Sequence, residues 1–261
     1  MEITKECNTL GTVKKGFLDR YMLKYLLLIL MTVDHLAVCF PDQIRETPFA
    51  IMHLYGSEVP TTDLMRFFGR IVAPIIAFLI AEGFAHTSNV TKYRRRIGLL
   101  AIISWFPSQF LFNGFEEIKA NPFKLLGQSV LVAFYFAIVA LCLWEKTGFR
   151  KWIKILFTVL LCFASLITDM PVVGVLAPLF HHIFRNDRKK RYISISLIYL
   201  LLLMITLKLQ GWYATGIFLA PLLIIFCYNG KGGKKKAFHK WLFYVYFPVH
   251  MIILGLFRWY F

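Results

Sequence analysis

The amino-acid sequence predicts an all-α, polytopic transmembrane helical bundle of about nine spans, folded as a single domain over residues 1–261. Of the 261 residues, 58% are hydrophobic, whereas soluble domains average about 45–50% apolar residues. The apolar residues form blocks of about 15–20, the length that a helix needs to cross the bilayer core. The basic residues fall in short clusters between these blocks, so the net charge of +16 reflects membrane topology and gives no indication of nucleic-acid binding.

The expected spans follow the apolar blocks in chain order. The first block is too long for a typical signal-peptide core and lacks a small-residue cleavage site, so we expect a permanent first helix after a cytoplasmic segment, residues 1–21. The sixth block is short and contains Pro171, Gly174 and Pro178, so we expect a broken, tilted or re-entrant segment that packs inside the protein. The spans are residues 22–40, 64–85, 97–113, 126–144, 152–168, 170–184, 193–209, 211–228 and 240–259.

The distribution of Lys and Arg predicts the orientation of these spans. With these boundaries, 23 of the 30 basic residues fall on the side of the N-terminus, 6 fall on the other side, and Arg70 lies within the second span. Cytoplasmic loops of membrane proteins carry an excess of Lys and Arg. We therefore expect a multi-pass protein of the cell (inner) membrane, with a cytoplasmic N-terminus and an external C-terminus.

Three ionisable residues lie inside the apolar blocks: Asp34 and His35 in the first, and Arg70 in the second. By helical rise, His35 and Arg70 lie roughly 8 and 9 Å below the outer ends of their spans, so they are level with one another. Charge in hydrocarbon costs several kcal/mol unless it is paired or hydrated, which makes this set a candidate catalytic site. The alternative is a structural knot, in which these side chains only link helices by hydrogen bonds.

Each member of this set has a candidate role. His35 has the pKa range of a general base at neutral pH, or it is an acyl acceptor. Neighbouring residues of a helix point about 100° apart, so Asp34 either orients His35 or pairs with Arg70. Arg70 is a candidate clamp for an acceptor carboxylate or a developing oxyanion, or it only neutralises Asp34. Gly69 would permit close helix approach, and Pro74 would introduce a local kink.

Further polar residues are candidates for binding. His250, in the ninth span after Pro248, is either a substrate-binding residue or a core histidine bonded to a neighbouring carbonyl. Asn113 and Asp169, at outer helix ends, are candidates for contact with an acceptor, although exposed loop polarity also explains them. The cysteines show no CxxC spacing, and we expect neither a metal site nor a disulfide framework.

The inner end of the second span and the loop after it contain the candidate donor site. Arg94, Arg95 and Arg96 are predicted to bind a polyphosphate ligand, since clustered arginines near a helix end suit phosphate. Glu82 and His86, one helical turn apart, lie beside this cluster. The alternative is a capped helix end followed by a loop whose positive charge only sets the topology.

At these residues the chain resembles the TraX family of membrane proteins, which is named for the acetylase of F-type pilin. The most specific elements are MTVDH (residues 31–35), GRIVAPIIAFLIAEGFAHT (residues 69–87) with the following Lys92-Tyr93-x-x-Arg96, and FPVH (residues 247–250). The third span departs from the family pattern, because Trp105 stands where the pattern has a carboxylate. The family-pattern positions matched here are Asp34, His35, Arg70, Glu82, Thr87, Tyr93, Arg96 and His250.

The resemblance implies a fold similar to that of transmembrane acyltransferases and a reaction that uses cytosolic acetyl-CoA as the donor substrate. Arg94, Arg95 and Arg96, together with Tyr93, Glu82 and His86, would then bind the acyl-CoA. The acceptor would be the amine of a pilin-like peptide or a hydroxyl of an envelope glycan, at the outer face. Two alternatives stay open: a small proton-coupled transporter, and a non-catalytic scaffold for envelope assembly or conjugation.

Overall fold

The computed structural model of the chain describes residues 16–54, 56–123, 129–233 and 237–260. Most of the predicted cytoplasmic segment lies outside these ranges, as do the topology-setting residues Lys5, Lys14, Lys15, Lys124, Lys234, Lys235 and Lys236. The α-helices are α1 (Arg20–Cys39), α2 (Pro41–Arg45), α3 (Thr61–Gly69), α4 (Val72–Ala85), α5 (Val90–Asn113), α6 (Phe115–Ala120), α7 (Val130–Glu145), α8 (Lys151–Ala164), α9 (Val173–Ile183), α10 (Arg188–Gln210), α11 (Leu219–Leu222) and α12 (Ala237–Tyr260).

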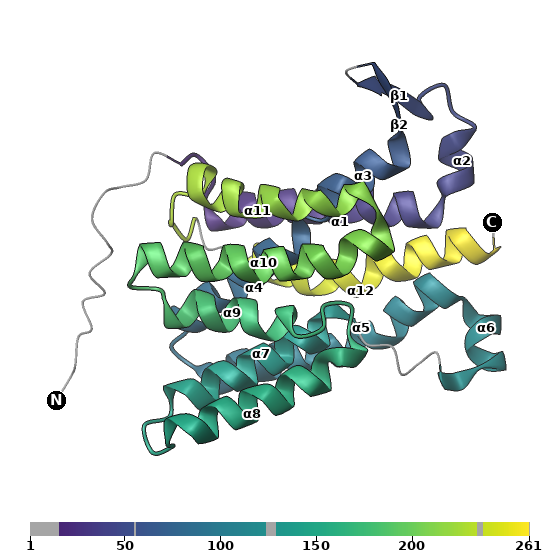
Figure 1. Cartoon of the computed structure of the whole chain (residues 1–261). Helices are drawn as coiled ribbons and strands as arrows, with labels where there is room; N and C mark the ends of the chain where they lie inside the picture. Colours follow the sequence, from purple (N-terminus) through teal and green to yellow (C-terminus); the bar gives the residue numbers. More distant parts are fainter. Residues whose placement is uncertain (1–15, 55, 124–128, 234–236, 261) are drawn as a thin grey trace.

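The remaining elements are short. A hairpin of β1 (Ile51–Leu54) and β2 (Ser57–Pro60) pairs antiparallel, with Met52 opposite Val59. The 3₁₀ helices are η2 (Ser165–Ile167) and η3 (Trp212–Phe218), and η4 (Leu223–Cys227) is a π-helix. Figure 1 shows the long helices lying lengthwise beside one another, with the hairpin, α6 and the C-terminus at one end of the bundle.

Three helical stretches of the described chain are long and apolar enough to cross a membrane: α1, Thr61–Ala85 and Trp241–Tyr260. The apolar segments Val130–Glu145, Val173–Ile183 and Trp212–Cys227 are shorter. The 11 residues of α9, for example, rise only about 17 Å, less than the roughly 30 Å of a bilayer core. The prediction of a helical protein with membrane-spanning segments is supported, whereas the count of nine spans stays a prediction.

Large apolar side chains cover the outside of the bundle. On α8 they form a stripe in which Trp152, Leu160 and Phe163 are 59%, 52% and 66% exposed. Soluble monomers rarely expose contiguous apolar patches of more than a few hundred Å². A stripe of this kind, along a helix that packs on α7 and α9 with its other side, is the surface expected of a helix that faces lipid.

The core lies around α4, α7 and α9. Phe134, Ile138 and Leu141 of α7 and Ile75 of α4 are fully buried. The predicted broken segment corresponds to α9, which begins only at Val173 and has most of its residues buried. As expected for this segment, it packs inside the protein against α7, α4 and α10.

The second predicted span is interrupted at Arg70. Helix α3 ends at Gly69 and α4 begins at Val72, and Arg70 itself is the C-cap of α3. Pro74 has no N–H to give to the carbonyl of Arg70 four residues earlier, which explains a break at this point. The Tyr199 hydroxyl of α10 donates to the Pro74 carbonyl at 3.0 Å, so a hydrogen bond from α10 stabilises the chain at the break.

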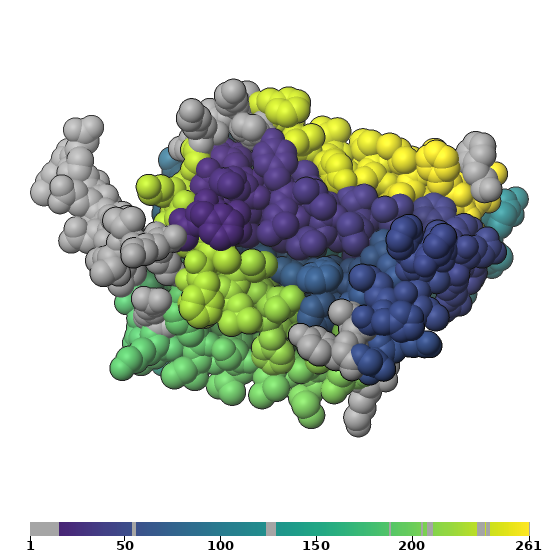
Figure 2. Space-filling view, turned by 90° about the horizontal axis from the view of Figure 1, so that it is seen from above, coloured from purple at the N-terminus to yellow at the C-terminus, as the bar shows by residue number. Residues whose placement is uncertain are grey.

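The predicted eighth span is irregular, because it is built from η3, α11 and η4 in succession. Figure 2 shows α1 lying between this segment and α12 on one face of the molecule. The close approach at η3 depends on Gly216: a Cβ there would lie 1.9 Å from the carbonyl oxygen of Phe67 in α3. This contact brings η3 against the C-terminal end of α3, next to Arg70.

Candidate functional site

Asp34 pairs with arginines of α3 and its C-cap, not with its neighbour His35. Its Oδ1 atom lies 3.7 Å from Nη2 of Arg70 and 4.0 Å from Nε of Arg66. The three side chains are only 18–22% exposed. Of the two roles that the sequence left open for Asp34, the structure supports pairing with Arg70 and adds Arg66 as a second cation.

Gly69 makes this ion cluster possible. A Cβ at Gly69 would lie 2.4 Å from both Cβ and Oδ1 of Asp34, much closer than atoms of real side chains approach. The glycine therefore lets α3 approach α1 at the level of the carboxylate, as the sequence predicted. Arg66 and Arg70 are one helical turn apart and so reach the same carboxylate from one face.

Tyr213 of η3 closes the other side of the cluster. The guanidinium carbons of Arg66 and Arg70 lie 5.2 and 5.6 Å from the centre of its ring, within the range of cation–π attraction. The Nε atoms of both arginines and Oδ1 of Asp34 are buried without a hydrogen-bond partner. Two guanidiniums facing one carboxylate leave an excess positive charge that suits an anion or a developing oxyanion.

Asp169 lies close enough to Arg70 to interact with its charge. Its carboxylate accepts a hydrogen bond from the backbone N–H of Val130 at the start of α7. Desolvation by surrounding residues raises the pKa of the Asp169 carboxyl above its ordinary value, although the residue remains partly exposed to solvent. The hydrogen bond from Val130 and the charge of Arg70 act in the opposite direction. This predicted acceptor contact therefore acts on Arg70 more weakly than Asp34 does.

His35 pairs with His250, although 215 residues separate them in sequence. Nδ1 of His35 lies 2.9 Å from Nε2 of His250, and the two rings are nearly parallel, with an interplanar angle of 7°. Phe112 of α5 meets the His35 ring edge to face at 5.9 Å. The pair thus joins α1, α12 and α5 inside the bundle.

The hydrogen bonds of this pair fix the tautomers of both rings. Nδ1 of His250 lies 2.9 Å from the carbonyl oxygen of Tyr246, which only accepts, so this nitrogen carries the proton. In a neutral His250 ring, Nε2 is then the acceptor, and Nδ1–H of His35 must be the donor. The Nε2 atom of a neutral His35 consequently holds a lone pair, as a general base requires.

Tyr246 is held by a second hydrogen bond. The Thr32 hydroxyl donates to the carbonyl of Leu28 at 2.8 Å, so the hydroxyl–hydroxyl bond between Thr32 and Tyr246 uses the tyrosine as donor. The Tyr246 ring also stacks on His250 at 5.0 Å. Helix α12 continues through Pro248, so Tyr246 and His250 lie on one continuous helix.

At the opposite end of the bundle, the three predicted arginines point in different directions. Arg94 is close enough to Cys142 of α7 to act on it electrostatically, and Arg96 lies over the Tyr93 ring at 6.0 Å. Arg95 lines an open depression of about 280 Å³ together with Asn89, Thr91 and Lys92. Consecutive residues of a helix turn by about 100°, which explains why the three do not converge.

The other predicted donor-site residues make intramolecular contacts. Tyr93 is buried, and its hydroxyl donates to the Ile80 carbonyl at 3.3 Å. Glu82 forms an ion pair with Arg20 at 3.6 Å. His86 donates from Nδ1 to the Glu82 carbonyl at 2.8 Å and so caps α4. Of the predicted set, Arg95 therefore has the clearest access to a ligand, and Lys92 and Asn89 are additions to it.

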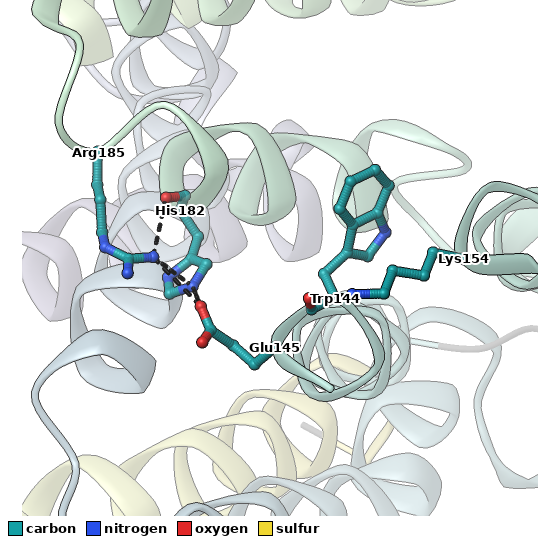
Figure 3. A network of polar contacts seen from close by, with 5 residues as sticks. All are labelled: Trp144, Glu145, Lys154, His182 and Arg185. Carbon is teal, nitrogen blue, oxygen red and sulfur yellow. Dashed lines mark hydrogen bonds and ion pairs between the residues drawn. The ribbon is translucent and has the colours of Figure 1, made fainter. Parts of the chain in front are cut away.

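A further polar network joins α7, α8 and α9 at this end, as Figure 3 shows. His182 Nε2 lies 2.6 Å from Oε1 of Glu145, and Arg185 donates to the same oxygen at 3.3 Å. The hydrogen bond from His182, followed by the charges around it, lowers the pKa of Glu145. Lys154 donates to the Trp144 carbonyl at 2.7 Å. These hydrogen bonds connect the ends of α7, α8 and α9, and the Glu145 carboxylate is hydrogen-bonded within the network.

Several of these residues were not among the predicted candidates. Arg66 precedes Arg70 by four residues, and Tyr246 precedes His250 by four, so helical spacing was the available signal. Tyr213 comes from an irregular segment and has no such signal.

The predicted residue Asn113 donates to Gln109 at 2.9 Å and lines a second depression at the end of α12. The described residues include no group of three or more His, Cys, Asp or Glu side chains placed to hold a metal.

Comparison with known proteins gives three findings. The chain is 28% identical over 245 residues to the "Probable fimbrial assembly protein FimC, serogroup H1" of Dichelobacter nodosus, which covers 90% of this chain and 93% of that relative. No solved structure shows a significant match. The family model of the TraX protein matches residues 19–258, which is nearly the whole sequence. The chain therefore belongs to the TraX family.

Proposed function

We propose that the chain is a membrane-embedded acetyltransferase that moves an acetyl group from cytosolic acetyl-CoA to an amine at the outer face. The observation that carries this proposal is the His35–His250 pair, whose hydrogen bonds leave a lone pair on Nε2 of His35, the residue that follows the Asp34 of the arginine cluster. A structural knot does not require a fixed tautomer with a free basic nitrogen. An acyl transfer from a thioester to an amine does require a base at the attacking atom.

In the proposed reaction, Nε2 of His35 takes a proton from the neutral acceptor amine as its nitrogen bonds to the acetyl carbonyl carbon. The carbon–sulfur bond breaks, and the leaving thiolate of coenzyme A takes up the proton that Nε2 of His35 removed from the amine, so that an N-acetyl product and a free thiol result and His35 returns to its neutral form. Arg66 and Arg70 would stabilise negative charge that develops on the carbonyl oxygen. The His250 ring would stabilise the positive charge on His35 by accepting its Nδ1–H.

The depression lined by Lys92 and Arg95 supports a donor site at the cytoplasmic end. Both side chains are exposed, and they adjoin the N-terminus of α5, where the helix dipole favours anions. Its volume of about 280 Å³ accommodates part of a nucleotide. The two cations would bind phosphate groups that cannot cross the membrane, while the thin pantetheine arm would extend along the bundle.

The acceptor that we propose is the N-terminal amine of a pilin-like peptide. The membership of the TraX family and the similarity to a protein named for fimbrial assembly favour such an acceptor over an envelope glycan. We place the protein in the cell membrane with its N-terminus in the cytoplasm. This orientation brings Lys92 and Arg95 to the donor side and His35 toward the acceptor side.

The test is transfer of labelled acetyl from acetyl-CoA to a synthetic peptide with a free N-terminus, with the purified protein in proteoliposomes. We expect the wild-type chain to label the peptide and His35→Ala to lose at least 100-fold in kcat. His53→Ala, on the exposed β1 strand, is the matched control and should retain full activity. Full activity in His35→Ala would contradict the proposal.

A scaffold for envelope assembly is the second candidate, because the name of the relative describes assembly and no chemistry. A scaffold would keep its function in His35→Ala and would show no stabilisation by acetyl-CoA. A rise of the melting temperature on adding acetyl-CoA, reduced by Arg95→Glu but not by Arg150→Glu, would favour the enzyme. Arg150 is an exposed arginine between α7 and α8 and lies outside the depression.

A further inference from the structure

A second depression, of about 350 Å³, lies where α5, α6 and the end of α12 meet. Figure 1 places α6 and the C-terminus at the same end of the bundle as the β1–β2 hairpin, which is the proposed outer end. No step of the proposed reaction uses this depression. Its lining includes Asn113, Phe115, Glu116, Glu117, Trp259 and Tyr260.

The walls of this depression are held in place by hydrogen bonds. Trp259 Nε1 donates to the carbonyls of Phe110 and Leu111, at 3.0 and 3.2 Å, and so satisfies carbonyls at the end of α5. The Arg258 guanidinium lies 4.8 Å from the centre of the Trp259 ring. Gly114 turns the chain from α5 into α6 with φ 74°, and a Cβ there would lie 2.9 Å from the Trp259 ring. The depression is therefore a formed feature of the fold.

The same two helices, α5 and α12, contribute residues to the depression and to the surroundings of the histidine pair. Asn113 directly follows Phe112, whose ring contacts His35. Along α12, nine residues separate His250 from Trp259, which corresponds to about 14 Å of helical rise. An extended peptide spans about 3.3–3.6 Å per residue. A peptide with its N-terminal amine at His35 would thus place about its fourth residue in the depression.

The chemistry of the lining favours a peptide over a sugar. Its surface is mostly apolar, and the exposed Phe115 and Tyr260 rings offer contact to an apolar side chain. The exposed carboxylate of Glu116 adds a negative charge in a chain whose net charge is +16. It would attract a basic side chain and repel an acidic one.

We propose that this depression is the acceptor subsite: it binds about the fourth residue of the acceptor peptide and prefers an aromatic or basic side chain over an acidic one. This inference rests on the proposed acetyltransferase function and adds to it the location and the selectivity of acceptor binding. Glu116 sets the charge preference, and Phe115 and Tyr260 provide the apolar contact.

The experiment uses the full chain with peptides that carry Tyr, Lys or Asp at position 4. Binding of the peptides, labelled at their C-termini, is measured by fluorescence anisotropy, and transfer is measured separately with acetyl-CoA. We expect Tyr and Lys peptides to bind at least 10-fold more tightly than the Asp peptide. Glu116→Lys should reverse the preference between Lys and Asp, and Tyr260→Ala should weaken binding of the Tyr peptide at least 3-fold.

Two control variants lie outside the depression. Glu46→Lys changes the same charge at an exposed position after α2, and Phe123→Ala removes an exposed ring beyond α6. Neither should change peptide binding, and none of the variants should change the KM for acetyl-CoA.

Equal binding of the three peptides, or a Glu116→Lys variant with unchanged preference, would overturn the assignment even if transfer is observed. Binding of sugars in place of peptides would overturn it as well. Absence of transfer from the wild-type chain would overturn the acetyltransferase proposal, whereas the anisotropy measurement would still decide whether the depression binds peptide.

Discussion

Nδ1 of His35 and Nε2 of His250 lie 2.9 Å apart, and this contact sets the protonation pattern of the candidate site. Because the Tyr246 carbonyl requires a proton on Nδ1 of His250, His250 accepts from His35. His250 therefore acts as a positioning residue for His35. The sequence left two roles open for His250, a substrate contact and a core histidine bonded to a carbonyl. The structure shows the bond to the Tyr246 carbonyl, and it adds the contact with His35, which the sequence did not predict.

The first prediction concerns this positioning. His250→Phe keeps an aromatic ring but removes the acceptor for His35 Nδ1–H, so the unfavourable tautomer becomes accessible. We expect kcat to fall about 10- to 100-fold, with the KM for acetyl-CoA unchanged. His250→Gln, whose side-chain oxygen accepts a hydrogen bond, should recover part of the loss. Equal kcat values for the two variants would argue against a role for the acceptor.

The second prediction concerns the buried ion cluster. Asp34→Asn leaves Arg66 and Arg70 without their shared carboxylate, so we expect a loss of about 3–5 kcal/mol in the free energy of unfolding. Arg66→Gln should cost less, because Arg70 still pairs with Asp34. Unfolding in mixed micelles of detergent and dodecyl sulfate measures both losses. If Arg66→Gln proves as costly as Asp34→Asn, the shared-carboxylate arrangement is wrong.

The third prediction concerns close packing at Gly69. Gly69→Ala forces a Cβ to within 2.4 Å of Asp34, so α1 and α3 must separate. Overpacking of this kind costs about 1–3 kcal/mol and should also displace the carboxylate, lowering acetyl transfer. Gly148→Ala is the matched control, since nothing lies within 4 Å of a Cβ at that position. Equal thermal stability of the two variants would contradict the close approach.

The fourth prediction concerns pH. The pKa of Glu145 is lowered, first by the hydrogen bond from His182 and then by the charges of His182 and Arg185. A lowered carboxyl pKa stabilises the folded state above the ordinary Glu value of about 4.3, and this contribution is lost as the pH falls through the lowered value. Because Glu145 is half exposed, we expect a modest effect.

Melting temperature as a function of pH measures this effect. Below about pH 4.3, the wild-type chain should lose stability more steeply than Glu145→Gln, and the two curves should converge. Glu58→Gln, on the exposed β2 strand, should follow the wild-type curve. A Glu145→Gln curve parallel to wild type throughout would show that this network does not contribute to acid sensitivity.

Helical class and the positions of the intramembrane polar residues followed from the sequence, because apolar block length and charge clusters are local properties of the chain. The close approach at Gly69 was also predictable, since a glycine beside a buried arginine indicates tight packing. The break at Arg70 follows from Pro74, whose missing N–H acts within one helical turn.

The length of individual helices was less predictable. Residues 170–184 and 211–228 have the composition of spans, but the structure gives an 11-residue α9 and a succession of 3₁₀, α and π turns. Composition does not distinguish a segment that crosses the bilayer from one that is buried in protein, because both are apolar. The packing of neighbouring helices makes that distinction.

The sequence by itself determined that Asp34, His35, Arg70 and His250 lie in apolar segments, where charge must be paired or hydrated. Only the tertiary structure decided the partners: His35 with His250 across 215 residues, and Asp34 with Arg66 and Arg70 under the Tyr213 ring. The physical reason is that helical periodicity fixes which face of a helix a residue occupies, whereas partner choice depends on which helices are neighbours. That neighbourhood is set by close contacts such as those of Gly69 and Gly216, which act between segments far apart in the chain.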